Sequence, residues 1–188
     1  MADPGTTARI ELWLGELHLP SVRRDYRKVA KEVSAAGGDF LAYLHTLLEE
    51  EVRDRRSRRV QRRLKEARFP QIKRLSDLDP KELPEGITLD LLNELARGEY
   101  LESATNIIAV GSSGTGKTHV CDALGVAACE QSKRVRRYKA IELTSELEEA
   151  QEQHQLHRYL RRFGSYDLVV IDELGYIDPP PKPVPESM

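Results

Sequence analysis

Residues 106–118 read Asn-Ile-Ile-Ala-Val-Gly-Ser-Ser-Gly-Thr-Gly-Lys-Thr, and this stretch decides the fold. Its first five residues form a short, nearly continuous apolar run, which is typical of a strand buried in a parallel sheet. The next eight match G-x-x-x-x-G-K-[ST], the pattern of a phosphate-binding loop. Residues 117–130 then have the pattern of a helix. A strand that leads through such a loop into a helix predicts an α/β domain built around a phosphate site.

The glycine spacing of the loop has a physical basis. Glycines let the backbone curl so that successive amides point at phosphate oxygens, and the following helix adds its positive N-terminal end. Lys117 is expected to reach the β- and γ-phosphates, and the Thr118 hydroxyl to ligate Mg²⁺. For His119, a place on the helix face is an equal alternative to a nucleotide contact. The nucleotide-binding candidates are Gly111, Ser112, Ser113, Gly114, Thr115, Gly116, Lys117, Thr118 and His119.

A second apolar strand ends in two carboxylates, since residues 168–173 read Leu-Val-Val-Ile-Asp-Glu. Asp172 is expected to hold Mg²⁺ through water, which makes Thr118 and Asp172 the metal-binding candidates. Glu173 is expected to orient and deprotonate the water that attacks the γ-phosphate, and it joins Lys117 as a catalytic candidate. Carboxylates often cap strands, so this pair is a weak indication alone, but downstream of a phosphate loop it is a strong one.

The segments between these motifs continue the α/β alternation. Residues 135–140 read as a polar strand, and residues 141–163 as one or two helices. Strand, helix, strand, helix, strand along the chain predicts a parallel sheet. Upstream, residues 87–96 read as a helix that Gly98 ends.

Residues 1–70 read as helical instead. Three apolar stripes recur at helical spacing, and Asp39 is a plausible N-cap for the third. Three short amphipathic helices can bury one another's stripes in a small bundle, although the stripes could also receive a partner helix. We therefore expect a helical region over residues 1–70, a partial ATPase-type domain over 71–178, and a proline-rich, disordered tail over 179–188.

Basic residues are concentrated between Arg53 and Arg74. This segment holds eleven arginines and lysines and only two acidic residues, Asp54 and Glu66, which gives it a formal charge of +9. The net charge of the whole chain is −2. Such asymmetry favours a polyanionic partner, and arginine suits phosphate better than lysine does. A solvated helix face is the other interpretation of the run.

The composition excludes several classes of protein. With 39% apolar and 32% charged residues, the chain is polar but not of the disordered type. No apolar stretch approaches the roughly 18 residues needed to span a bilayer, and the N-terminus lacks the pattern of a secretory signal. Two cysteines do not make a disulfide framework. We expect a cytoplasmic protein without a membrane segment.

With the loop GSSGTGKTH (111–119), the strand LVVIDELGY (168–176) and the segment RRLKEARFP (62–70) in place, the chain resembles the IstB family. These are AAA+ ATPases that help insertion-sequence transposases capture target DNA, and they are related to DnaC-type helicase loaders. The resemblance, from about Ile10 to Tyr176, implies a P-loop NTPase sheet, ATP with Mg²⁺, and DNA and a transposase as partners. It also implies a homo-oligomer through the ATPase domain. By this likeness the DNA-contact candidates are Arg55, Arg56, Arg58, Arg59, Arg62 and Arg63.

The chain departs from the family pattern after residue 176. An IstB-like domain continues there with a fourth strand, an arginine finger and a fifth strand, in the sheet order 5-1-4-3-2. We therefore expect a C-terminally truncated domain with impaired hydrolysis, whose two apolar strands pair directly or leave buried backbone groups unsatisfied. The polar strand at 134–139 fits the edge of that order. A helicase loader and a non-enzymatic remnant that binds DNA or a partner are the alternative functions.

Overall fold

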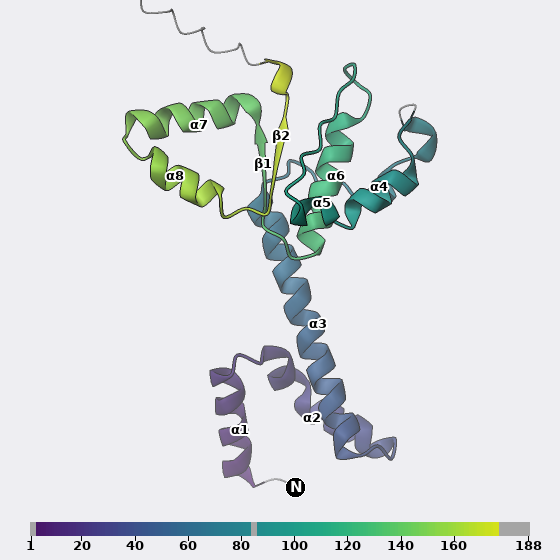
Figure 1. Ribbon diagram of the computed structural model, residues 1–188. Coiled ribbons are helices and arrows are strands. Elements are labelled where there is room, and N and C mark those ends of the chain that lie inside the picture. Colours follow the sequence, from purple (N-terminus) through teal and green to yellow (C-terminus); the bar gives the residue numbers. More distant parts are fainter. Residues whose placement is uncertain (1–2, 84–85, 177–188) are drawn as a thin grey trace, which may run out of the picture. The chain divides into compact units, whose positions relative to one another are not determined.

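The computed structural model describes residues 3–83 and 86–176, and Figure 1 labels its elements. The chain forms two compact units, Met1–Arg59 and Val60–Met188. Three helices come first along the chain, and the third continues into the second unit. Their bounds are Pro4–Glu16 for α1, Pro20–Ala35 for α2 and Phe40–Ala67 for α3.

The second unit alternates helices with two strands, as an α/β fold does. Its longer elements are α4 (Leu89–Ala96), α6 (Lys117–Glu130), β1 (Val135–Lys139), α7 (Ala140–Glu152), α8 (Leu156–Phe163) and β2 (Leu168–Asp172). Short helical turns fill the connections: η1 (Leu75–Asp77), η2 (Pro80–Glu82), α5 (Glu99–Glu102) and η3 (Leu174–Tyr176). The predicted helix over 117–130 is confirmed, and the predicted helical stretch over 141–163 is two helices.

The helices of the first unit bury only part of their apolar stripes against one another. Val22 and Val29 of α2 and Leu47 of α3 form the buried core. Much of the first and third stripes is exposed, including Trp13 at 54% and Phe40 at 92%, so neither of the two interpretations is decided. The predicted cap of the third helix is confirmed. The Asp39 carboxylate accepts the backbone amide of Ala42 at 2.8 Å, which satisfies a donor that has no partner inside the helix.

Glu51 on α3 caps the N-terminus of α2. It is 3% exposed, and its Oε2 accepts the backbone amides of Ser21 at 2.8 Å and Val22 at 3.4 Å. These amides lie in the first turn of α2, where a carboxylate also meets the positive end of the helix. Arg55 and Arg58 each place a guanidinium nitrogen 3.3 Å from Glu51 Oε1. One buried carboxylate therefore joins two helices of this unit.

β1 and β2 form a two-stranded parallel sheet, seen side by side in Figure 1. The register pairs Val135 with Leu168 at one end and Lys139 with Asp172 at the other. Because strand side chains alternate between faces, Val135, Arg137 and Lys139 share one face of β1. α6 contacts both strands. In the described part of the chain the sheet has only these two strands, so both are edge strands and the predicted edge position of the polar strand stays a prediction.

The core of the second unit forms where the end of α3 meets α6 and the sheet. Phe69, just after α3, packs so closely on α6 that a Cβ on Gly125 would lie 2.7 Å from the phenylalanine Cζ. The last turns of α3 thus belong to this unit, which begins at Val60 and not after residue 70 as the sequence predicts. The buried core residues are Leu64, Ala67, Val126, Ala128, Cys129, Val135 and Val170.

The predicted strand at residues 106–110 is wrong. The segment has no strand conformation and all five residues are exposed, with Ile108 at 79% and Val110 at 89%. A strand needs a neighbour for its backbone hydrogen bonds, and in the described part of the chain the sheet holds only β1 and β2. Residues 106–110 do not pair with the Asp-Glu strand. Their backbone groups are not buried without a partner either, because the segment is exposed to water.

The predicted proline-rich tail, residues 179–188, lies outside the described residues. Between residues 3 and 176, leaving aside 84–85, no helix is both long enough and apolar enough to cross a membrane.

We expect Glu51→Ala to destabilise the helical unit by about 1–3 kcal/mol, because it leaves two amides of α2 without an acceptor. Burial acts to raise the pKa of Glu51, but the Ser21 and Val22 amides and the Arg55 guanidinium outweigh it and hold that pKa below its ordinary 4.5. The stabilisation is therefore present above pH 4.5 and is lost as pH falls through the lower, folded-state pKa. Urea unfolding followed by fluorescence of Trp13, the single tryptophan, measures it.

The control variant is Glu49→Ala, which removes an exposed carboxylate from the same helix. Equal stabilities of the Glu51 and Glu49 variants would contradict the capping role.

Candidate functional site

The predicted phosphate loop, residues 111–116, runs directly into α6. Gly114 and Gly116 have φ angles of 80° and 81°, the left-handed region that residues with a Cβ rarely adopt. Gly116 is the N-cap of α6 and brings no side chain to cap it. The first amides of α6 are therefore free to meet an anion, and the positive end of the helix is directed at the same place.

The Lys117 side chain lies back over the loop. Its Nζ donates to the Ser112 carbonyl at 2.6 Å and to Thr115 Oγ1 at 3.4 Å. Thr115 Oγ1 in turn donates to the same Ser112 carbonyl at 2.9 Å. These contacts hold the ammonium group against the loop, where it can exchange a backbone carbonyl for a phosphate oxygen.

The structure brings Thr118 and Asp172 together, although they are 54 residues apart. Thr118 Oγ1, in the first turn of α6, donates to Asp172 Oδ1 at the end of β2 at 3.1 Å. A hydroxyl and a carboxylate are the hard oxygen donors that Mg²⁺ prefers, and this ion takes one or two protein ligands beside phosphate and water. No group of three or more His, Cys, Asp or Glu residues in the described ranges is arranged to hold a metal by itself. The donor set fits a magnesium ion shared with a nucleotide.

Glu173 follows β2 with a φ of 62°, a conformation uncommon for a residue with a side chain. Its amide donates to Asp172 Oδ1 at 3.0 Å, and its exposed carboxylate lies 3.4 Å from Lys139 Nζ. The turn thus sends this carboxylate away from the line of the strand. Its role as a base stays a prediction.

Arg137 is a site residue that the sequence reasoning missed. From β1, its Nη2 donates to Asp172 Oδ2 at 2.8 Å and its Nε donates to Asp122 Oδ1 at 3.3 Å. The side chains of Arg137 and Asp122 are only 8% and 2% exposed. Burial raises the pKa of Asp122, with Arg137 acting in the opposite direction. Arg137 holds one oxygen of Asp172, so that the other faces Thr118.

Two signals in the sequence point to this pair in hindsight. Asp122 interrupts the apolar helix stretch His-Val-Cys-Asp-Ala-Leu, and a buried carboxylate needs a partner. Arg137 shares a strand face with Val135, so the face turned toward the core carries a cation. An edge position alone does not account for Arg137, because side chains alternate between the two faces of a strand and Arg137 lies on the same face as the buried Val135.

His119, the last of the nucleotide-binding candidates, makes no hydrogen bond through its Nε2 to any described residue. This nitrogen is also enclosed by protein. This observation does not distinguish a place on the helix face from a nucleotide contact. The nucleotide contact of His119 stays a prediction.

The six arginines predicted to contact DNA have different surroundings. Arg55 and Arg58 are bound to Glu51 in the first unit. Arg63 donates to the Ser132 carbonyl at 3.2 Å and pairs with Glu66 at 3.1 Å in the second unit. The other three are exposed and make no ion pair with any described residue: Arg56, Arg59 and Arg62.

Comparison with known proteins gives a consistent set of similarities. A family model described as IstB-like ATP binding protein matches residues 13–180. The chain is 28% identical over 170 residues to a Sinorhizobium fredii protein whose name describes an insertion sequence ATP-binding protein, covering 90% of this chain and 57% of that one.

Two further relatives carry similar names. The chain is 29% identical over 168 residues to the protein named for ATP binding in insertion sequence IS21 of Pseudomonas aeruginosa, which covers 89% of this chain and 63% of the relative. It is 30% identical over 142 residues to the corresponding protein of IS232 from Bacillus thuringiensis. This match covers 74% of this chain and 56% of the relative. The chain thus spans 56–63% of the length of these three relatives.

We expect Arg137→Met to destabilise the second unit by about 3–5 kcal/mol, because it leaves the Asp122 carboxylate buried without its cation. The double variant Arg137→Met/Asp122→Leu should regain most of this loss, since it removes both charges. Labelling of the buried Cys129 thiol during urea unfolding reports on this unit. The charge-matched control is Arg158→Ala, at an exposed position of α8.

The deficit of the single variant should also depend on pH. Loss of Arg137 should raise the folded-state pKa of Asp122 further, because burial then acts without an opposing cation. Asp122 is then protonated more readily in the folded state, so the loss of stability should become smaller as pH falls from 7 toward 5. A loss that the double variant does not repair would contradict the buried ion pair.

Proposed function

Because the chain belongs to the IstB-like ATP-binding protein family, we propose that residues 111–119 bind the triphosphate of ATP together with Mg²⁺. The hydrogen bond between Thr118 and Asp172 carries the proposal, since it joins the helix after the phosphate loop to the end of β2. Loop amides and the N-terminus of α6 would hold the phosphates, and Lys117 would contact their oxygens. The relatives named above as ATP-binding proteins support the choice of nucleotide.

Mg²⁺ would be held by Thr118 Oγ1 and, directly or through water, by Asp172. When bound, the ion neutralises phosphate charge and fixes the geometry of the β- and γ-phosphates. The task of Arg137 is to hold the Asp172 carboxylate in position, because one of its oxygens is already taken at 2.8 Å.

The geometry of the site supports ATP binding better than it supports ATP hydrolysis. A general base must reach a water molecule beside the γ-phosphate, whereas the Glu173 carboxylate is paired with Lys139 at 3.4 Å. Glu173 would have to leave that partner before it could accept a proton. We infer that this chain binds ATP and hydrolyses it slowly.

The biological role that we propose is that of an accessory protein in transposition, which binds DNA beside a transposase. The relatives named for insertion sequences support this context. Arg56, Arg59 and Arg62 of α3 are the groups that we expect to contact DNA phosphates, because these three exposed arginines have no carboxylate partner among the described residues. Assembly of several copies through the ATPase domain belongs to the same proposal.

We expect Lys117→Ala to weaken binding of magnesium-ATP at least tenfold, because the variant removes the single side-chain cation that lies over the loop. Isothermal titration with ATP and excess MgCl₂ measures the affinity, and phosphate release from the same samples reports turnover. Lys133→Ala, outside the loop, is the control and should bind like the parent chain. Equal affinities of the two variants would refute the site.

For DNA, the combined variant Arg56→Ala/Arg59→Ala/Arg62→Ala should lower affinity and flatten its salt dependence. Each lost phosphate contact reduces the slope of log affinity against log salt by about 0.9. The charge-matched control is Lys133→Ala/Arg158→Ala/Arg161→Ala, which should keep the steep slope. Fluorescence anisotropy with a labelled duplex at several NaCl concentrations gives both values; identical slopes would count against contacts by α3.

A further inference from the structure

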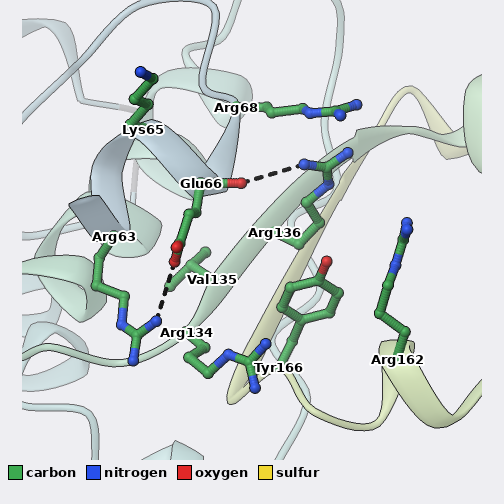
Figure 2. A pocket seen from close by; sticks show the side chains of 9 residues that line it. All are labelled: Arg63, Lys65, Glu66, Arg68, Arg134, Val135, Arg136, Arg162 and Tyr166. Carbon is green, nitrogen blue, oxygen red and sulfur yellow. Dashed lines mark hydrogen bonds and ion pairs between the residues drawn. The ribbon is translucent and has the colours of Figure 1, made fainter. Parts of the chain in front are cut away.

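A second cationic site lies in the second unit, at the opposite end of the strands from the phosphate loop. A cavity of about 490 Å³ lies where the end of α3, the start of β1 and the end of α8 meet. Figure 2 shows the side chains that line it. Six basic side chains and one carboxylate, Glu66, line it. The basic residues are Arg63, Lys65, Arg68, Arg134, Arg136 and Arg162.

The cavity is separate from the nucleotide site. Arg134 and Val135 stand at the beginning of β1, whereas Lys139, Asp172 and the loop contacts lie at the carboxyl ends of the strands. A strand of five residues at roughly 3.3 Å per residue puts about 13 Å between the two ends. One ligand phosphate cannot occupy both places.

Arg136 is the fixed cation of the cavity. It is only 6% exposed, its Nη1 donates to the Glu66 carbonyl at 3.2 Å, and its guanidinium lies 5.1 Å from the centre of the Tyr138 ring. Its Nε is buried without a hydrogen-bond partner among the described residues. A buried arginine with an unmade hydrogen bond is costly unless something else compensates its charge.

The local carboxylate does not supply that compensation. Glu66 is already paired with Arg63 at 3.1 Å, and it meets Arg136 through its backbone carbonyl and not through its side chain. Arg68 and Arg162 are exposed at the rim, and Tyr166 stands beside Arg134, whose guanidinium lies 5.8 Å from the ring centre. Arg162 is also 4.0 Å from the Glu146 carboxylate. The six basic side chains of the cavity therefore outnumber the two carboxylates, Glu66 and Glu146, that pair with them.

Arg68 has a backbone conformation that is uncommon for a residue with a side chain. It follows the last residue of α3 with a φ of 62°, in the left-handed region that glycine or asparagine adopts more readily. This turn brings Arg68 to the cavity rim, close to Arg136 in the view of Figure 2. Planar guanidinium groups on several sides suit the tetrahedral oxygens of a phosphate.

We propose that this cavity is a second phosphate-binding site, which takes the phosphate groups of a phosphorylated ligand or of a nucleic acid backbone. Arg136 supplies the held cation, while Arg68 and Arg162 close on the oxygens from two sides. The site is independent of the ATP site, and the arginines of α3 tested for DNA binding above do not line it.

The test is made in the Lys117→Ala chain without Mg²⁺, so that the loop contributes little. Arg68→Asn/Arg162→Ala removes two exposed cations of the cavity, and asparagine tolerates the backbone of residue 68. The control variant, Arg158→Ala/Arg161→Ala, loses the same charge from exposed positions of α8 that do not line the cavity. Unchanged Cys129 labelling verifies that both variants are folded.

Two probes are titrated, inorganic pyrophosphate by calorimetry and a labelled 15-base-pair duplex by anisotropy. We expect the cavity variant to bind pyrophosphate at least tenfold more weakly than the control variant does. If duplex binding falls in parallel, the ligand is a nucleic acid backbone; if it does not, the ligand is a small phosphorylated molecule. Equal affinities of the cavity and control variants for both probes would overturn the site.

Discussion

The buried guanidinium of Arg137 is the constraint on which the second unit depends. It lies between Asp122 on α6 and Asp172 on β2, and it is itself part of β1. A cation that is 8% exposed must keep a carboxylate partner, and Asp122 in turn has to keep its cation. The three elements that build the phosphate site are therefore tied together by charge as well as by apolar packing.

This constraint determines the geometry of the site. With Oδ2 of Asp172 occupied, Oδ1 is left facing the Thr118 hydroxyl at 3.1 Å. Thr118 lies in the first turn of α6, directly after the loop, so the candidate metal ligands lie next to the candidate phosphate-binding amides. In the proposed function, a nucleotide would meet oxygen donors that are already oriented, which lowers the cost of ordering them on binding.

Charge is also unevenly distributed along the strands. At their carboxyl ends, positive groups of the loop and helix alternate with the carboxylates of Asp172 and Glu173, which suits an anion bound with a metal ion. At their amino ends, guanidinium groups gather with Glu66 as the one carboxylate of the cavity lining. We propose that the first site takes a phosphate together with Mg²⁺ and that the second takes a phosphate alone.

The sequence by itself indicated the helix over 117–130, the Asp39 cap, and two strands predicted at 135–140 and 168–171 and found at Val135–Lys139 and Leu168–Asp172. The helix and its cap depend on neighbours within a few residues, which a pattern records, whereas the two strands formed because each pairs with the other. The strand predicted at 106–110 failed because strand formation needs a partner strand, and the described sheet supplies none beside it. The tertiary structure alone decided that Arg137 meets Asp122 and Asp172, and that Arg136 is buried, because these pairings depend on register and packing between distant segments.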